Sequence, residues 1–180
     1  HHTTFFINSL AHIWGSQPFT DRNSARDNGI LAFFTFGEGY HNFHHLFEND
    51  YRNGIRWWQF DPTKWLIRIA AWCGLARDLR SCPEERIEQA RLEMQLKRAQ
   101  ARLHKQDDRE LWQALLQEEY DKLSLQIQHY YANRKQLLEQ RKRKALARYD
   151  RLKLQLEYRN LRDGFLVAKR NWSRLLAGIA

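Results

Sequence analysis

The most constraining feature of this chain is the run GEGYHNFHH, which extends from Gly37 to His45. Within it His41, His44 and His45 stand at positions i, i+3 and i+4, so a helix over these residues places all three imidazoles on one face. Neutral imidazole nitrogens bind iron, copper, zinc and nickel alike. The spacing therefore predicts a transition-metal site and leaves the metal open.

A second histidine motif, Asn8-Ser9-Leu10-Ala11-His12, lies upstream. Residues 3–14 are expected to form a helix that ends at Gly15. Asn8 precedes His12 by four residues, so the two side chains share a helix face. The carboxamide of Asn8 is therefore in a position to hold a water molecule bound to the same metal.

Together the two motifs resemble the C-terminal half of the integral membrane fatty acyl desaturases, in the acyl-CoA delta-9, or stearoyl-CoA desaturase-like, branch. That family carries NSxAH followed by GEGxHNxHH, and the resemblance extends from about Thr3 to Leu79. It implies a centre of two iron ions held by histidine nitrogen. The implied ligands are His12, His41, His44 and His45, with Asn8 acting through water. The resemblance also implies that Thr4 and Phe5 contact the substrate, and it implies no catalytic residue beyond the metal ligands.

The resemblance implies an oxidoreductase that introduces a cis double bond, at the ninth carbon, into a saturated C16–C18 acyl chain. The reaction uses O2 and two electrons from an external ferredoxin- or cytochrome-type protein and its reductase. The acyl-lipid desaturases share these motifs, so the substrate is an acyl-CoA or an acyl-lipid. We expect an integral membrane protein that contacts membrane lipid and has its histidine boxes on the cytoplasmic side.

The family also carries an HxxxxH box and an HxxHH box before these motifs, and neither precedes them here. The sequence opens at His1, and its only methionine is Met94. We therefore expect a C-terminal fragment of a longer protein, inactive by itself.

Composition changes near Leu79–Pro83. Residues 1–82 contain 8 Lys and Arg against 7 Asp and Glu, whereas residues 83–180 contain 22 against 14. We predict an all-α chain of two parts. Residues 1–80 are the C-terminal part of a desaturase helical bundle, with the end of the last membrane helix, the last histidine box and an interfacial helix. Residues 81–180 are a basic, coiled-coil-like helical tail.

The predicted interfacial helix begins at Pro62. Its apolar positions Trp65, Ile69 and Trp72 oppose three cations, Lys64, Arg68 and Arg77. This pattern suits a membrane interface, and a core-facing helix of a soluble domain is the alternative. The resemblance favours the interface.

In the tail, Ser81 and Glu84 form a capping box that opens a helix. Apolar residues then recur with heptad-like spacing, at Leu92, Leu96, Ala99, Leu103, Leu116, Tyr120, Leu123, Ile127, Tyr130, Leu137, Ala145, Tyr149, Leu152 and Leu156. Asp163-Gly164 is expected to end the helix, and residues 165–180 to form a short amphipathic piece whose apolar side includes Trp172.

The basic run from Arg141 to Lys144 has four candidate roles: a solvated helix face, or contact with nucleic acid, anionic lipid or an acidic electron-donor protein. We expect lipid, and not nucleic acid, as the partner. A non-enzymatic basic helical interaction or scaffold protein is the alternative function. The four motif histidines argue against it, because a scaffold has no use for them.

Overall fold

The structure, a computed structural model, describes residues 9–103, 108–143 and 148–179. These residues are predominantly helical, and the extended pairing among them is limited to two isolated bridges, Ser16 with Asp27 and Asp27 with Tyr40. The predicted all-α class is confirmed. The chain divides into two compact units, residues 1–94 and residues 95–180.

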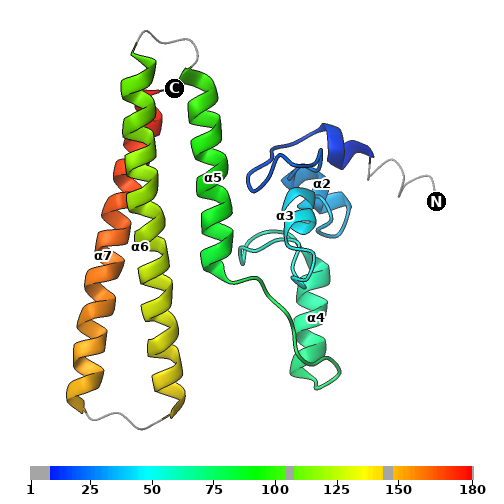
Figure 1. Cartoon of the computed structure of the whole chain (residues 1–180). Coiled ribbons are helices and arrows are strands. Elements are labelled where there is room, and N and C mark those ends of the chain that lie inside the picture. Colours follow the sequence, from blue (N-terminus) through cyan, green and yellow to red (C-terminus); the bar gives the residue numbers. More distant parts are fainter. Residues whose placement is uncertain (1–8, 104–107, 144–147, 180) are drawn as a thin grey trace. The chain divides into compact units, whose positions relative to one another are not determined.

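The first unit contains a helical turn at residues 9–13, followed by three short helices and the beginning of a long one (Figure 1). The three are α2 (Gly29–Phe34), α3 (His41–Leu46) and α4 (Pro62–Trp72), and the long helix is α5 (Glu84–Arg102). Since a six-residue helix is marginal on its own, α2 and α3 depend on contacts made by the loops around them.

An aromatic cluster forms the core of the first unit. Phe19, Phe43 and Ile87 are buried together, and the rings of Phe19 and Phe43 meet edge to face with centroids 5.4 Å apart. The guanidinium of Arg91 lies over the Phe19 ring, 4.9 Å from its centroid. The first turns of α5 therefore pack on the histidine-bearing segment, and this unit extends to Met94, past the change in composition at residues 79–83.

Helix α4 begins as the sequence predicts, with Pro62 in its first turn and Asp61 as its N-cap. The Asp61 carboxylate is fully buried and accepts hydrogen bonds from the backbone amides of Asn53, Gly54 and Lys64. The sequence pattern places Lys64 with the cations opposite the Trp residues, but its side chain is not on the surface. Its ammonium is buried and donates to the carbonyls of Gly54 and Arg56 at 2.6 and 3.0 Å, because the loop before α4 folds back over it.

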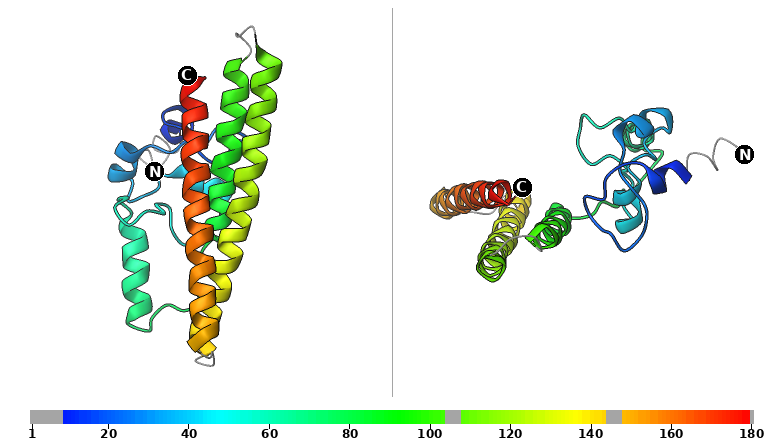
Figure 2. Two further views of the ribbon diagram at one scale, coloured as in Figure 1. Left: turned by 90° about the vertical axis from the view of Figure 1, so that its left-hand side faces the viewer. Right: turned by 90° about the horizontal axis from the view of Figure 1, so that it is seen from above.

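The second unit contains the end of α5 and two long helices, α6 (Arg109–Arg143) and α7 (Arg148–Gly178). α6 and α7 lie side by side as an antiparallel hairpin in Figure 1 and in the two turned views of Figure 2. Leu116, Leu123 and Ile127 of α6 are buried, as their spacing predicts. The Tyr130 ring stacks on Phe165 and Tyr158 of α7, with centroids 5.2 and 5.6 Å apart.

Two expectations for α7 are wrong. Gly164 does not end the helix, because Phe165 and Ala168 after it bury the same helix face as Leu161 before it. This burial offsets the modest cost of a glycine inside a helix. Leu152 and Leu156 were expected to continue the buried stripe, yet each side chain is 58% exposed.

Trp172, by contrast, is 2% exposed, and its indole donates a 2.8 Å hydrogen bond to Gln95. Its side of α7 is thus part of the core of the second unit. Within the described residues, no helix combines the length and the apolar character that crossing a bilayer requires.

Candidate metal centre

The backbone before α3 is shaped by the two glycines of the GEG sequence. Gly37 has φ +105°, and a Cβ there would lie 2.8 Å from the Asp61 carboxylate. A Cβ on Gly39 would run into the backbone of Ala32 in α2. Only glycine lets this loop pass between α2 and Asp61, so these residues set where α3, which carries the histidines, begins.

Asn42, which the sequence analysis gave no role, anchors α3 to the preceding loop. Its side chain is fully buried. Oδ1 accepts from the amides of Phe19 and Thr20 at 2.9 and 3.2 Å, and Nδ2 donates to the carbonyls of Thr20 and Ala25 at 2.7 and 2.9 Å. All four bonds join the residue beside His41 to residues 19–25.

Asp27 caps α3 from a distance. The N-cap residue Tyr40 supplies no side-chain hydrogen bond, whereas Asp27 Oδ1 accepts from the amides of Asn42 and Phe43 at 2.8 and 3.1 Å. Burial raises the pKa of Asp27 to about 6, although these two hydrogen bonds and the charge of Arg91 favour its ionised form. Sequence reasoning missed Asp27 and Asn42 because no local pattern indicates that they meet.

Three of the predicted histidines lie close together where α3 meets the turn at residues 9–13. The Nε2 atoms of His12 and His41 are 3.2 Å apart, and those of His41 and His45 are 3.0 Å apart. One ligand atom from each of the three lies within 4.8 Å of the others. His12 comes from the turn at residues 9–13, and the other two come from α3, one helical turn apart.

The separations of His41 from His12 and from His45 fit shared binding of one transition-metal ion. With metal–nitrogen bonds of about 2.0–2.1 Å, neighbouring ligands at angles of about 90–110° have nitrogens about 2.9–3.4 Å apart. The donor set is three imidazoles, which suits iron among other metals. The residues present therefore fit a metal in this position.

Ser24 orients His12. The hydroxyl oxygen of Ser24 lies 2.8 Å from Nδ1 of His12. The His12 tautomer that is protonated at Nδ1 donates to this oxygen and leaves Nε2 with a lone pair facing His41. An outer hydrogen bond that fixes the tautomer and the ring plane is usual for histidine ligands. Ser24 lies in a polar loop, so the sequence gave no signal for this role.

The electrostatics of the cluster favour the neutral forms of His41 and His45. Burial, reinforced by repulsion from His45, His12 and His44, lowers the pKa of His41 to about 4. Burial and the same kind of repulsion, from His44 and His12, also lower the pKa of His45. A metal must compete with protons for its ligands, so this site is ready for a metal at neutral pH.

His44 lies beside the cluster and outside the group of three. Its side chain is exposed, and its ring centroid is 6.3 Å from that of His41 and 5.9 Å from that of His45. The structure thus brings together three of the four predicted histidines. Asn8, Thr4 and Phe5 lie outside the described residues.

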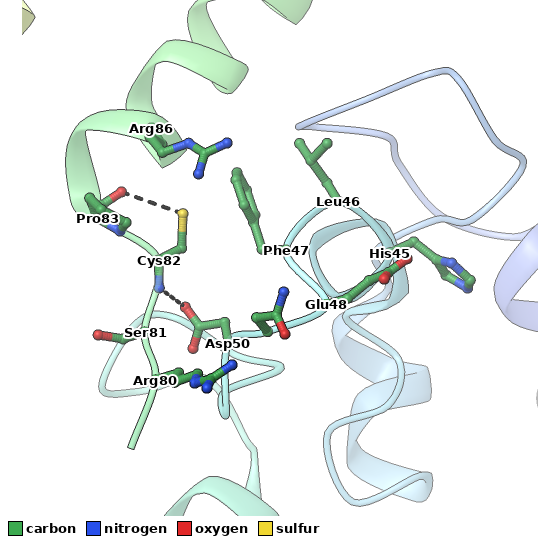
Figure 3. A pocket seen from close by; sticks show the side chains of 11 residues that line it. His45, Leu46, Phe47, Glu48, Asp50, Arg80, Ser81, Cys82, Pro83 and Arg86 are labelled. Atoms are coloured by element: carbon green, nitrogen blue, oxygen red, sulfur yellow. Dashed lines mark hydrogen bonds between the residues drawn. The ribbon is translucent and has the colours of Figure 1, made fainter. Parts of the chain in front are cut away.

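A pocket of about 500 Å³ lies next to this centre in the first unit. It lies between the segment after α3 and the start of α5, and its lining includes Arg86, Cys82 and Phe47. Figure 3 shows the His45 imidazole at the edge of this group, turned away from Arg86 and Cys82. The Cys82 amide donates to Asp50, and burial raises the pKa of the Cys82 thiol. The pocket borders the histidine cluster, because His45 is one of its lining residues.

The first part of the chain is similar to known proteins. Residues 1–71 match the family model for fatty acid desaturases. The chain is 58% identical to a probable acyl-CoA desaturase of Schizosaccharomyces pombe over 88 aligned residues. The aligned residues are 49% of this chain and 18% of that protein. Over 95 residues it is 55% identical to acyl-CoA desaturase 1 of Saccharomyces cerevisiae, covering 53% of this chain and 19% of that protein.

A plant relative is also similar. Over 80 residues the chain is 42% identical to delta-9 acyl-lipid desaturase 1 of Arabidopsis thaliana, covering 44% of this chain and 26% of that protein. The chain spans about a fifth to a quarter of the length of these relatives. The resemblance predicted from the two histidine motifs is confirmed. Residues 1–71 are therefore similar to a segment of the fatty acid desaturases.

Proposed function

We propose that the first part of this chain is the C-terminal part of an oxygen-dependent acyl-CoA desaturase. The complete protein introduces a cis double bond, at the ninth carbon, into a saturated C16–C18 acyl chain. The observation that carries the proposal is the convergence of His12, His41 and His45 in a segment matched by yeast acyl-CoA desaturases. The iron pair, when bound, supplies the oxygen chemistry that removes two hydrogens from the acyl chain.

In this proposal His12, His41 and His45 hold one iron through Nε2, and His44 serves the other. The position of His44, outside the group formed by His12, His41 and His45, supports this division. Histidines from an HxxxxH box and an HxxHH box complete the centre in the full protein. Ser24, Asp27 and Asn42 are positioning residues, because they orient His12 and fix α3 without reaching the metal.

Other roles follow from the family pattern. Asn8 holds an iron-bound water, and Thr4 and Phe5 contact the acyl chain. Electrons come from a ferredoxin- or cytochrome-type protein and its reductase. The second candidate substrate is an acyl-lipid, and the 42% identity to a plant acyl-lipid desaturase supports keeping it. The higher identities to the two yeast acyl-CoA desaturases favour the CoA thioester.

We also propose that this part of the chain lies at the cytoplasmic surface of a membrane. Two helices expose large apolar side chains that a soluble unit would cover. In α2 and the residues after it these are Ile30, Phe33, Phe34 and Phe36, and in α4 they are Trp65, Leu66, Ile69 and Trp72. Trp72 is 89% exposed. A bilayer interface is a suitable cover for such aromatic surfaces.

A chimaera tests the proposed activity. In it, the first unit of this chain replaces the matching segment of acyl-CoA desaturase 1 of Saccharomyces cerevisiae, in a strain that lacks that enzyme and is fed an unsaturated fatty acid distinguishable from the products. We expect new monounsaturated C16 and C18 chains by gas chromatography, and iron in the purified chimaera. Replacing His41 by Ala in the chimaera should remove both. Product formation unaffected by this replacement, at equal protein levels, contradicts the proposal.

A further inference from the structure

We propose that one exposed face of α7 binds the surface of a membrane that contains anionic lipid. We call it the outer face of α7, and it consists of Leu152, Leu156, Arg159, Leu166, Val167, Arg170 and Arg174. The inference concerns the second unit and depends neither on iron nor on the acyl substrate. Trp172 belongs to the opposite side of this helix and is buried.

The outer face lies opposite the buried side of α7. At about 100° per residue, its seven residues fall within an arc of about 100°, whereas Phe165, Ala168 and Trp172 lie on the other side of the helix. Leu152 and Leu156 are each 58% exposed, and Leu166 and Val167 are each 46% exposed. These aliphatic side chains are therefore available to a surface outside the unit.

The charge of this face selects an anionic surface. α7 carries eight Lys and Arg against three Asp and Glu. Arg159, Arg170 and Arg174 are exposed, and within the described part of the chain none of them forms an ion pair. Asp163 lies on the same line but pairs with Arg162 at 3.0 Å. Arginine places its stem along apolar groups and its guanidinium among phosphates, as the headgroup layer requires.

α6 provides an internal contrast. It also exposes leucines on the side opposite its core, at Leu111, Leu115 and Leu125. Glu118, Asp121 and Lys122 share that side of the helix, so its leucines are not accompanied by a net positive charge. An anionic leaflet therefore attracts the outer face of α7 more strongly than this side of α6.

The same contrast suggests a second copy of the chain as a rival partner, because acidic and basic stripes attract each other. The carboxylates of α6 are already engaged: Glu118 pairs with Lys122 at 2.6 Å, and Asp121 accepts from Gln117 at 3.0 Å. A protein interface would also have to bury three arginines along the middle of the face, which is costly unless each is paired. Lipid headgroups leave them hydrated. Nucleic acid offers phosphates but no apolar layer for the four aliphatic side chains.

The test reads the contact locally in the full 180-residue chain. Cys73 and Cys82 are replaced by Ser, and Leu156→Cys or Val167→Cys then carries an environment-sensitive fluorophore. The matched control is Leu125→Cys in α6, whose side chain is 53% exposed. Vesicles of phosphatidylcholine, with and without phosphatidylserine, are titrated in at physiological salt. The local label separates this contact from any membrane binding by residues 1–94.

We expect a blue shift from the labels at positions 156 and 167 with phosphatidylserine vesicles, a weaker response with neutral vesicles, and little from the control. Arg170→Gln with Arg174→Gln should raise the lipid concentration for half the shift about 30-fold, from roughly fivefold per arginine. Arg109→Gln with Lys135→Gln removes an equal charge from α6. This pair should change the lipid concentration for half the shift by a smaller factor.

Three results would overturn the inference. One is an equal shift at position 125, which would mean that no particular face is selected. Another is a shift that depends on protein concentration in the absence of lipid, which would indicate a second copy of the chain. The third is a stronger response to duplex DNA or RNA than to vesicles at the same salt. Circular dichroism of each variant confirms that the helices are retained.

Discussion

Nε2 of His12 lies 3.2 Å from Nε2 of His41, although 29 residues separate the two histidines in the chain. One comes from the turn at residues 9–13 and the other from the first residue of α3. Neither element reaches the other by local geometry. The candidate metal centre therefore depends on the loop that joins them.

The chain should bind a divalent transition metal weakly through its three-histidine cluster. His41 contacts both partners, so His41→Ala should lower the affinity of the 180-residue chain for Co²⁺ by more than the ~10–100-fold that an outer-shell change costs. Visible absorption of bound Co²⁺ reports the site. His129→Ala removes an exposed histidine of α6 and is the matched control. Equal losses in the two variants would mean that the metal binds elsewhere.

Ser24→Ala should reduce metal affinity about 10–100-fold without unfolding the chain, because it removes the hydrogen bond that orients His12. Ser24→Thr retains a hydroxyl and should recover most of the affinity. In the chimaera, Ser24→Ala should likewise reduce activity, and Ser24→Thr should recover most of it. If Ala and Thr behave alike at this position, Ser24 has no part in orienting the ligand.

Asp27 should make the first unit less stable as the pH rises. Its pKa is about 6 in the folded chain and 3.8 in the reference state, so its contribution is present below pH 3.8 and is lost as the pH passes 6. Asp27→Asn retains an acceptor oxygen and should gain about 2–3 kcal/mol relative to the original chain between pH 4 and 7. Urea unfolding at each pH measures this difference.

Stability is compared between the original chain and the Asp27→Asn variant because protonation of His41 changes the stability in the opposite direction. Its pKa falls from 6.5 to about 4, so its contribution is present above pH 6.5 and is lost as the pH drops. This part is common to both chains and cancels in the difference. A difference that stays constant with pH would show that Asp27 is ionised throughout the range.

Gly164→Ala should stabilise the second unit by about 0.5–1 kcal/mol, because Gly164 is inside α7 and nothing lies within 4 Å of an added Cβ. Gly39→Ala should destabilise the first unit strongly, because its Cβ would run into the backbone of α2. Thermal unfolding followed by circular dichroism measures both. A destabilising Gly164→Ala would mean that the helix is kinked or ended at this residue.

Much of the helical outline could be predicted from local patterns. Pro62 and Asp61 mark the start of α4, and the spacing of Leu116, Leu123 and Ile127 marks the buried side of α6. Histidine spacing within one turn of α3 likewise predicts that His41 and His45 meet. In each case the information lies within a few residues of the chain.

What the sequence could not reveal depends on contacts between distant segments. Lys64 has the spacing of a surface cation, and only the fold of residues 53–56 buries it. Gly164 resembles a helix end, and only packing of Phe165 against α6 continues the helix. Ser24, Asp27 and Asn42 contribute single hydrogen bonds or caps across loops, for which no periodicity exists.

The shortness of α3 has a consequence for the order of folding. Six residues pay the full cost of nucleating a helix and gain few internal hydrogen bonds in return. The caps from Asp27 and the anchoring bonds of Asn42 exist only after residues 19–27 have closed onto this segment. We therefore expect His41 and His45 to come into register late, after the surrounding loops are in place. In this order of events, metal binds a site that is already folded and does not nucleate the folding of the chain.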